Sequence, residues 1–244
     1  MTRRLLATTA VLASLAAPAA AGAATVDLQV RAGGGDDAAE AFGHARDGVP
    51  RWHVTSERGV GLTGTFRDDL GAVPYGAQCH LLITNLATGR ERRDDDCVAD
   101  DDGTFSTGAS PRQHVRVRVV IEKDTSDAEH PIAADTVSAP VELRVRPWVE
   151  LRDVYTGGRL LDGRLVIRFN AVVDDSPGIR KGRLFLQRKA GAGFVTVAGK
   201  RIGASPYVTF ETIAPKLGQY RVLWKTATPK LLDDAPSKLL AYRR

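Results

Sequence analysis

The sequence predicts an all-β protein in which two tandem β-sandwiches follow a cleaved signal peptide. Three observations support this fold class. Short runs in which apolar and polar residues alternate recur from residue 60 onward, and no helical period separates them. Runs from about Leu62 to Val145 are echoed in the same order, about 103 to 105 positions later, by runs from about Leu165 to Tyr242. Repetition at this spacing indicates two copies of one all-β unit.

The first residues of the chain predict export. Arg3 and Arg4 precede an uncharged apolar run of thirteen residues, Leu5 to Ala17, and small residues follow it. This is the pattern of a secretory signal peptide, and the run is too short to span a bilayer. We expect cleavage after Ala23, with Ala24 as the alternative. The arginine pair also resembles a twin-arginine signal, but the charged region is short, so the general secretory route is the first expectation.

The charge of the exported chain points to no particular partner. Two of the 34 basic residues leave with the signal peptide, so 32 basic and 29 acidic residues remain, a formal net charge of +3. So small an excess gives no reason to expect nucleic-acid binding. No later apolar stretch is long enough for a membrane helix. We therefore expect a secreted protein, or one loosely associated with the cell surface.

Two cysteines predict a disulfide bond. Cys79 and Cys97 are the only cysteines, and an even count in an exported protein favours pairing. A hairpin that turns at Ala87-Thr88-Gly89 has its midpoint at position 88, which is also the midpoint of the two cysteines. We therefore expect them to face each other across adjacent antiparallel strands. On the loop-entropy estimate such a bond stabilises the fold by roughly 3 kcal/mol.

Pro147 marks the predicted boundary between the two sandwiches, because proline restricts the preceding residue to extended geometry and cannot continue a ladder. After the signal peptide, 1–23, the domains are 24–146 and 147–244. The first opens with an appendage, which we expect to contain a strand from Thr25 to Val30 and one or two helical turns from Ala38 to Ala45. The strands expected in the first sandwich are Val60–Phe66, Gln78–Asn85, Glu91–Val98, Thr104–Ser106, His114–Glu122 and Pro140–Val145. Those expected in the second are Val149–Leu151, Arg159–Asn170, Arg183–Arg188, Gly193–Ala198, Tyr207–Thr212, Gln219–Thr226 and Lys238–Tyr242.

Two motifs in the second half resemble a known family. Leu217–Val222 is similar to the tyrosine-corner region of immunoglobulin-like and fibronectin type III-like folds, with Tyr220 as the tyrosine and Val115 at its position in the first half. Leu184–Arg188 with Gly193–Ala198 resembles the central hairpin of bacterial immunoglobulin-like repeats in secreted proteins of high-GC bacteria. The resemblance implies Greek-key sandwiches and a role in adhesion, spacing or binding.

An acidic run is the strongest charge feature. Asp94, Asp96, Asp100 and Asp102 belong to six carboxylates within nine positions, and carboxylate oxygens are good calcium ligands. The spacing of a helix-loop-helix calcium site fails from every start, and Asp102-Gly103 also suits a simple turn. A weak calcium site at these four residues and a solvated turn are both kept as hypotheses.

Four arginines are expected to form a basic stripe. Arg116, Arg118, Arg144 and Arg146 alternate with apolar residues, and their strands are expected to be neighbours. Such a stripe would suit an anionic wall polymer or a sugar acid. The alternative is that solvated arginines discourage edge-to-edge pairing of sheets.

The sequence contains no recognisable pattern of catalytic residues. It shows no nucleophile, acid–base pair or zinc-ligand spacing, and Gly59–Gly64 lacks the strand, helix and acidic residue that a dinucleotide site requires. The leading hypothesis is a secreted, non-catalytic binding or structural protein without a cofactor, whose partner is an extracellular protein. The alternative is a carbohydrate- or wall-polymer-binding protein that uses either the acidic run with calcium or the arginine stripe. A hidden hydrolytic activity is the third class.

Overall fold

The computed structural model describes residues 24–31, 39–56, 59–72, 76–126, 132–175, 178–213 and 215–242. These residues form strands throughout, with one short 3-10 turn, Ile179–Lys181, and no α-helix among them. The predicted all-β fold class is confirmed. The predicted signal peptide lies outside the described residues. None of the helical structure that the described part of the chain contains is long and apolar enough to cross a membrane.

Two sheets form the N-terminal half, which we define as residues 24–146. In the first sheet, β5 pairs with three strands; its members are β1 (Thr25–Val26), β2 (Gln29–Arg31), β5 (Val60–Arg67) and β8 (Thr104–Ala109). The second sheet follows the order β3 (Glu40–His44), β4 (Pro50–Thr55), β11 (Val141–Arg146), β9 (Val115–Ile121), β6 (Gln78–Asn85) and β7 (Glu91–Val98), with β10 (Thr136–Val137) on β9. All described pairs in it are antiparallel except β11 with β4.

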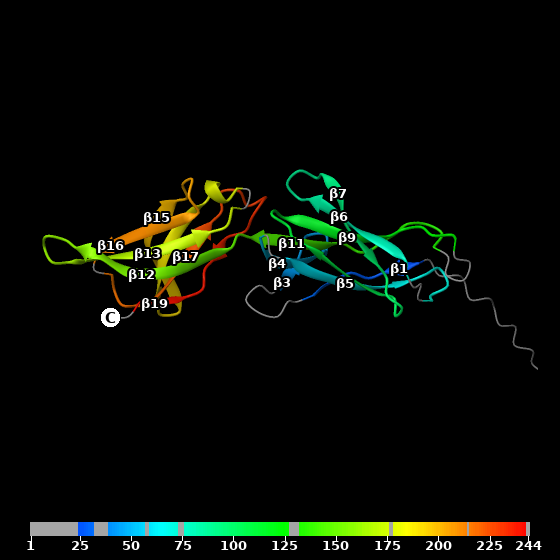
Figure 1. Cartoon of the computed structure of the whole chain (residues 1–244), viewed down its shortest axis with the longest axis horizontal. Coiled ribbons are helices and arrows are strands. Elements are labelled where there is room, and N and C mark those ends of the chain that lie inside the picture. Colours follow the sequence, from blue (N-terminus) through cyan, green and yellow to red (C-terminus); the bar gives the residue numbers. More distant parts are fainter. Residues whose placement is uncertain are drawn as a thin grey trace, which may run out of the picture.

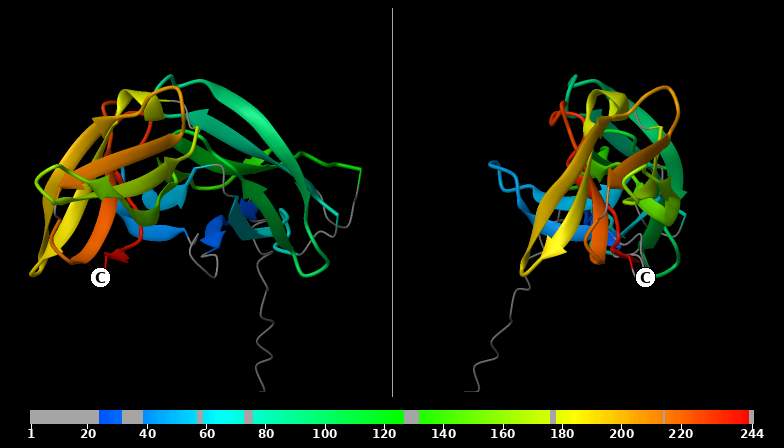
Figure 2. Two further views of the ribbon diagram at one scale, coloured as in Figure 1. Left: turned by 60° about the vertical axis from the view of Figure 1, so that its left-hand side comes forward. Right: turned by 90° about the vertical axis from the view of Figure 1, so that its left-hand side faces the viewer.

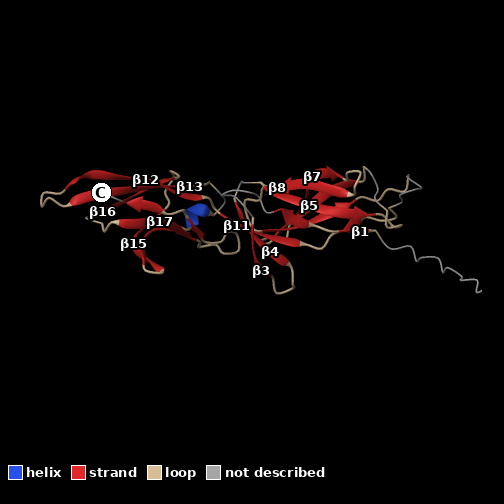
Figure 3. Ribbon diagram, turned by 90° about the horizontal axis from the view of Figure 1, so that it is seen from below, coloured by secondary structure: helices blue, strands red, loops and turns tan. Residues whose placement is uncertain are grey.

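Two further sheets form the C-terminal half, residues 147–242. One has the order β12 (Val149–Arg159), β13 (Leu165–Val173) and β16 (Tyr207–Ile213). The other has β15 (Gly193–Arg201), β14 (Arg183–Ala190), β17 (Gly218–Lys225) and β18 (Ala235–Pro236), with β19 (Leu240–Tyr242) also on β17. No described strand of one half pairs with a strand of the other. The halves lie end to end in Figures 1 and 3, and the right-hand view of Figure 2 looks along this axis, so that the two halves overlap.

Period-two burial explains the layers. In β5 the residues Val60, Leu62 and Phe66 are buried while Thr65 and Arg67 are exposed. Strands of the opposite sheet alternate in the same way, so that the inward-facing side chains of both sheets close over one core. The sandwich expected from the sequence is therefore present.

Three predicted elements were wrong. In place of the helical turns expected from Ala38 to Ala45, Glu40 to His44 forms β3 and pairs along β4. Ala38 itself lies outside the described residues. The strand expected from Arg159 to Asn170 is broken by a turn, in which Leu160 N–H donates to the Arg164 carbonyl and Gly163 takes a φ of 79°. The strand expected from Thr25 to Val30 is two short strands, β1 and β2.

One local arrangement occurs in both halves. Ser138 Oγ accepts a hydrogen bond from Val119 N–H at 2.9 Å, and Ser138 N–H donates to the Val119 carbonyl at 2.9 Å. Ser237 does the same with Val222, at 2.9 Å and 2.8 Å. This shared arrangement aligns Val119 with Val222, which places Val117, rather than Val115, at the position of Tyr220. The internal duplication stays a prediction from the sequence.

The tyrosine corner suggested by the resemblance is formed. Tyr220 is fully buried, and its hydroxyl donates to the carbonyl of Lys216, four residues earlier, at 2.5 Å. The ring packs against Phe169, with centroids 4.7 Å apart. This hydrogen bond satisfies the only polar atom of the buried side chain and fixes how the chain enters β17.

Candidate functional site

A group of ionisable side chains, partly or completely buried, lies where the two halves meet. Asp233, in the loop that joins β17 to β18, reaches onto the outer face of the seven-stranded sheet. Its carboxylate pairs with Arg144, at 2.8 Å from Nη2 to Oδ1 and 3.3 Å from Nε to Oδ2. His53 Nδ1 lies 3.4 Å from Oδ2, and His114 Nε2 lies 3.5 Å from Oδ1. The backbone N–H of Asp233 donates to the Val145 carbonyl at 2.9 Å. We call Asp233, Arg144, His53 and His114 the junction cluster.

The tautomer of His114 follows from its neighbours. His114 is completely buried, and its Nδ1 accepts a hydrogen bond from the backbone N–H of Val145 at 2.9 Å. A nitrogen that accepts carries no proton, so the proton of the neutral ring is on Nε2, which faces Asp233. The backbone N–H of His114 also donates to the Leu231 carbonyl at 2.9 Å, which adds another contact between the halves.

Two pKa values in the junction cluster are shifted. Burial raises the pKa of Asp233, but hydrogen bonds from His114 and Arg144 and the charge of Arg144 outweigh it and hold this pKa well below its ordinary value. Burial, followed by the charge of Arg146, lowers the pKa of His53 to about 4, although Asp233 opposes this. At neutral pH the cluster therefore holds an ionised carboxylate and a neutral His53.

The four arginines of the predicted stripe do lie on neighbouring strands. β9 and β11 pair with Arg116 opposite Glu142. Each guanidinium has a carboxylate: Arg116 pairs with Asp47 at 2.9 Å, Arg118 with Glu91 at 2.6 Å, Arg144 with Asp233 at 2.8 Å and Arg146 with Glu40 at 3.4 Å. The face is therefore balanced in charge, and a ligand-binding role for these four residues stays a prediction.

Sequence reasoning missed the buried Glu142 on this face. Its carboxylate lies 3.0 Å from Arg51 Nε and 3.7 Å from both Arg116 Nη2 and Arg144 Nη1. A buried carboxylate is tolerated only when it is paired, and here three arginines surround it. The sequence signal was a glutamate between two buried apolar residues in a strand whose other outward positions are arginines.

The acidic run is placed around β7 and the turn that follows. Asp94 pairs with Arg92 at 2.8 Å, and Asp102 Oδ1 accepts from Thr104 N–H at 2.8 Å as a turn residue. Hydrogen bonds with Thr104 lower the pKa of Asp102. Asp100 is exposed in the same turn, and the side chain of Asp96 lies outside the described residues. Within the described ranges, no three His, Cys, Asp or Glu residues come together as a metal site. The calcium site stays a prediction.

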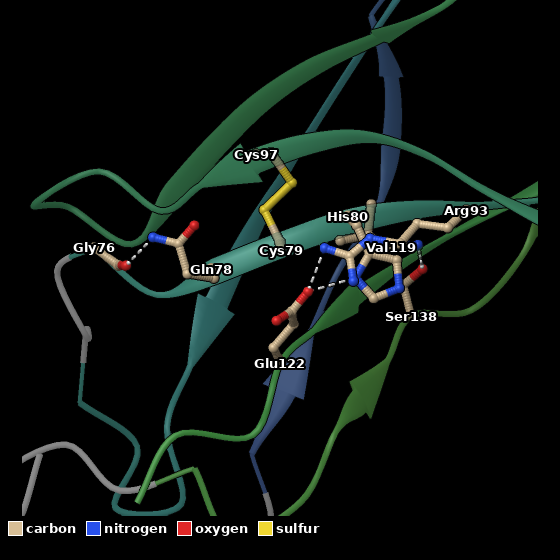
Figure 4. The surroundings of a disulfide bond; sticks show 9 residues. All are labelled: Gly76, Gln78, Cys79, His80, Arg93, Cys97, Val119, Glu122 and Ser138. Atoms are coloured by element: carbon tan, nitrogen blue, oxygen red, sulfur yellow. Dashed lines mark hydrogen bonds and ion pairs between the residues drawn. A yellow bond between two sulfur atoms is a disulfide. The ribbon is translucent and has the colours of Figure 1, made fainter. Parts of the chain in front are cut away.

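The predicted disulfide is confirmed. Cys79 and Cys97 are direct partners across β6 and β7, with Cα atoms 4.8 Å apart (Figure 4). Beside it, Glu122 pairs with His80 at 3.0 Å and with Arg93 at 2.7 Å. Both sulfur-bearing residues are buried in the core, so the bond has a structural environment rather than that of a reactive thiol pair.

Two clefts border the junction. One, of about 520 Å³, lies between the halves and is lined by residues that include Glu40, His53, Arg146 and Trp148. The other, of about 740 Å³, lies at the end of the N-terminal sandwich that faces the C-terminal half. Its cationic lining residues, Arg90, Arg92 and Arg112, were not selected from the sequence. The signal available was three arginines in the four residues after Gly89.

No family model matches the sequence, and no curated protein matches it. Among solved structures, the chain is similar to a DUF4785 family protein from Legionella pneumophila subsp. pneumophila, at 10% identity over 78% of this chain and 54% of that one, with a TM-score of 0.38. It is also similar to a marsupial T cell receptor, at 11% identity over 89% of this chain and 71% of that one, with a TM-score of 0.29. The chain thus spans about half of the Legionella protein. At these scores neither likeness carries an argument about function.

Proposed function

We propose that this chain is a non-catalytic extracellular binding or structural protein, in which two immunoglobulin-like sandwiches act as one stiff adhesion or spacer unit. The observation that carries the proposal is the junction cluster. Asp233 of one half is held by two side-chain bonds to Arg144 and one backbone bond to Val145 of the other. Because Asp233 is held through both its side chain and its backbone, bending at Pro147 would break several contacts together.

The chemistry of the cluster supports a structural role. A general acid or base works best when its pKa lies near the operating pH. The pKa of Asp233 is held far below that range, and the pKa of His53 is lowered to about 4. Both groups therefore keep one protonation state at neutral pH. The disulfide between Cys79 and Cys97 supports a location outside the cell, because such bonds persist in oxidising compartments.

Small-angle X-ray scattering of the purified protein tests the stiffness. We expect one end-to-end arrangement to fit the profile of the unmodified protein, and D233A to require several orientations of the halves. The control is D162A, which removes an exposed carboxylate that pairs with Arg164 in the β12–β13 turn. If the unmodified protein itself requires several orientations, the two halves are not a stiff unit and the proposal is wrong.

A second candidate function is carbohydrate or wall-polymer binding, which the 740 Å³ cleft with its arginine lining favours. Retention of the purified protein on isolated cell wall, measured with and without a chelator, tests it. Loss of retention with the chelator would point to the acidic run and calcium. Retention that is weakened by salt and unaffected by the chelator would point to the arginines.

A further inference from the structure

We propose that the 740 Å³ cleft, which we call the arginine cleft, binds an acidic saccharide through its carboxylate or phosphate oxygens. The inference rests on the binding role proposed above and names a site and a ligand class for it. The cleft opens where the two sheets of the N-terminal sandwich separate, between the β6–β7 hairpin and the segment that joins β8 to β9. Its size suits a small ligand or the end of a polymer.

The floor of the arginine cleft is aliphatic. Ile83, Pro111 and Val115 are buried residues that line it. None of the lining residues is aromatic, so no flat ring is offered for stacking. The C–H face of a sugar ring can cover such a floor while its oxygens remain available to the rim.

One amide at the rim must present a donor. Asn85 Oδ1 accepts from the backbone N–H groups of Ala87 and Thr88, at 2.9 Å and 3.1 Å. Asn85 Nδ2 therefore points the other way and donates to Gln113 Oε1 at 2.9 Å. This fixes the Gln113 amide, so that its free end is the Nε2 group with two N–H donors. A ligand that meets this group must accept hydrogen bonds.

The rim is positively charged. Arg90, Arg92 and Arg112 line the cleft, against one acid, Glu91. Glu91 is already engaged by Arg118 Nη2 at 2.6 Å and by Thr84 Oγ1 at 3.0 Å. The guanidinium of Arg90 has no partner among the described residues, whereas Arg92 shares Asp94. Three guanidiniums and an amide donor match an oxyanion, because each offers N–H groups and none can accept.

The position of Arg92 is unusual for a charged residue. It stands opposite Ile83 across β6 and β7, and Ile83 belongs to the buried face of the sheet. β7 is an edge strand, so an inward charge there has two explanations. It protects the edge from pairing with another sheet, or it receives a ligand charge at the mouth of the sandwich. The unpartnered Arg90 and the oriented Gln113 amide on the same cleft favour the second explanation.

Binding of defined polymers tests the proposal. The probes are polygalacturonate, which carries carboxylates, phosphorylated dextran, and neutral dextran, each measured by titration calorimetry at low and at high salt. We expect the unmodified protein to bind one or both acidic polymers, more weakly at high salt, and to leave neutral dextran unbound. Which acidic polymer binds distinguishes a sugar carboxylate from a phosphate.

Two variants locate the site. R90Q/R112Q and Q113E are expected to weaken binding by about tenfold or more, because they remove guanidinium donors or replace the amide N–H groups with an acceptor. The control R159Q/R164Q removes the same net charge from an exposed pair at the β12–β13 turn. It is expected to leave binding within about twofold, because this turn lies at the end of β12 opposite to Val149 and the junction.

Several outcomes would overturn the proposal. If the control pair weakens binding as much as R90Q/R112Q, only net charge is at work. If neutral dextran binds as well as the acidic polymers, the arginines do not select the ligand. If no acidic polymer binds at low salt, the cleft is not a ligand site, and self-association of R92V in sedimentation would then assign Arg92 to edge protection. Each of these leaves the scattering test of stiffness unaffected, so the two proposals fail separately.

Discussion

The two halves fill the same place in their cores with different chemistry. In the N-terminal half, Cys79 pairs across the sheet with Ile121 on one side and with Cys97 on the other. In the C-terminal half, Leu184 pairs with Trp224 in the corresponding place. The serine arrangement gives the same alignment, since it matches Val119 to Val222 and therefore Ile121 to Trp224. Trp224 thus takes the position of Ile121, and its cross-strand partner Leu184 takes the position of Cys79. A covalent bond strengthens this part of one core, and a large aromatic side chain fills the same part of the other.

Trp224 needs neighbouring residues that leave space for its indole ring. The indole is fully buried and its Nε1–H donates to the Ile179 carbonyl at 3.0 Å. A Cβ atom at Gly182 would lie 2.4 Å from the ring, so a glycine is needed beside it. The disulfide half needs no such space, because Cys79, Cys97 and Ile121 are small. The comparison indicates that one sandwich plan can be stabilised by a cross-link or by packing.

Removing the aromatic residue should have the largest effect. W224A deletes a buried indole and leaves a cavity and an unpaired carbonyl, so we expect the C-terminal half to lose about 3–5 kcal/mol of unfolding free energy. Hydrogen exchange measured by mass spectrometry should show faster exchange in β14 and β17 than in β6 and β9. If hydrogen exchange becomes faster to the same extent in both halves, the halves unfold as one unit. Their cores could then not be compared as separately stabilised units.

Removing the cross-link should have the next largest effect, confined to the other half. C79A/C97A opens a loop with a sequence separation of 18, for which loop entropy gives a loss of roughly 3 kcal/mol. Denaturant unfolding of the double variant measures the loss, and hydrogen exchange in β6 and β7 locates it. Reduction of the unmodified protein is the control, because it removes the bond without creating a cavity. A loss that appears in β14 and β15 instead would contradict the assignment.

Contacts between residues that are close in the sequence could be predicted, whereas contacts between residues far apart in the sequence could not. The disulfide was predictable because both cysteines lie on one hairpin, whose turn is marked by Gly89 with a φ of 69°. The strands of that hairpin were predictable from their alternation. The junction cluster was not, because Arg144 and Asp233 are 89 residues apart and no local pattern links them. β3 was missed for the same reason, since its strand conformation comes from pairing with β4 rather than from its own sequence.

Acid should weaken the N-terminal half through His53. The folded-state pKa of His53, about 4, lies below that of an unfolded histidine, about 6.5. The unfolded chain therefore binds a proton first as the pH falls, and stability decreases between about pH 6.5 and pH 4, by at most about 3 kcal/mol. Below that range the His53 contribution levels off. Asp233 acts in the same direction only at much lower pH, because its folded pKa is depressed far below its ordinary value.

Urea unfolding at neutral pH and at about pH 4 measures this effect. H53F, which keeps a ring beside Phe42, should remove most of the decrease, since Phe42 and His53 stack with centroids 3.7 Å apart. The matched control H44F changes an exposed histidine and should leave the decrease in place. If the pH dependence of H53F is unchanged, other groups cause the acid sensitivity. His53 then does not make the N-terminal half less stable in acid.

The smallest effects should come from the serine arrangement that both halves contain. Ser138 and Ser237 each accept a backbone N–H at 2.9 Å and each donate to the next carbonyl, at 3.0 Å and 2.9 Å. Both serines are buried, so S138A and S237A each leave a buried N–H without its side-chain acceptor, at a cost of about 1 kcal/mol. Unfolding free energies of the two variants should match within error. Unequal losses would mean that the surrounding core, cross-linked in one half and aromatic in the other, changes how much the same hydrogen bonds contribute.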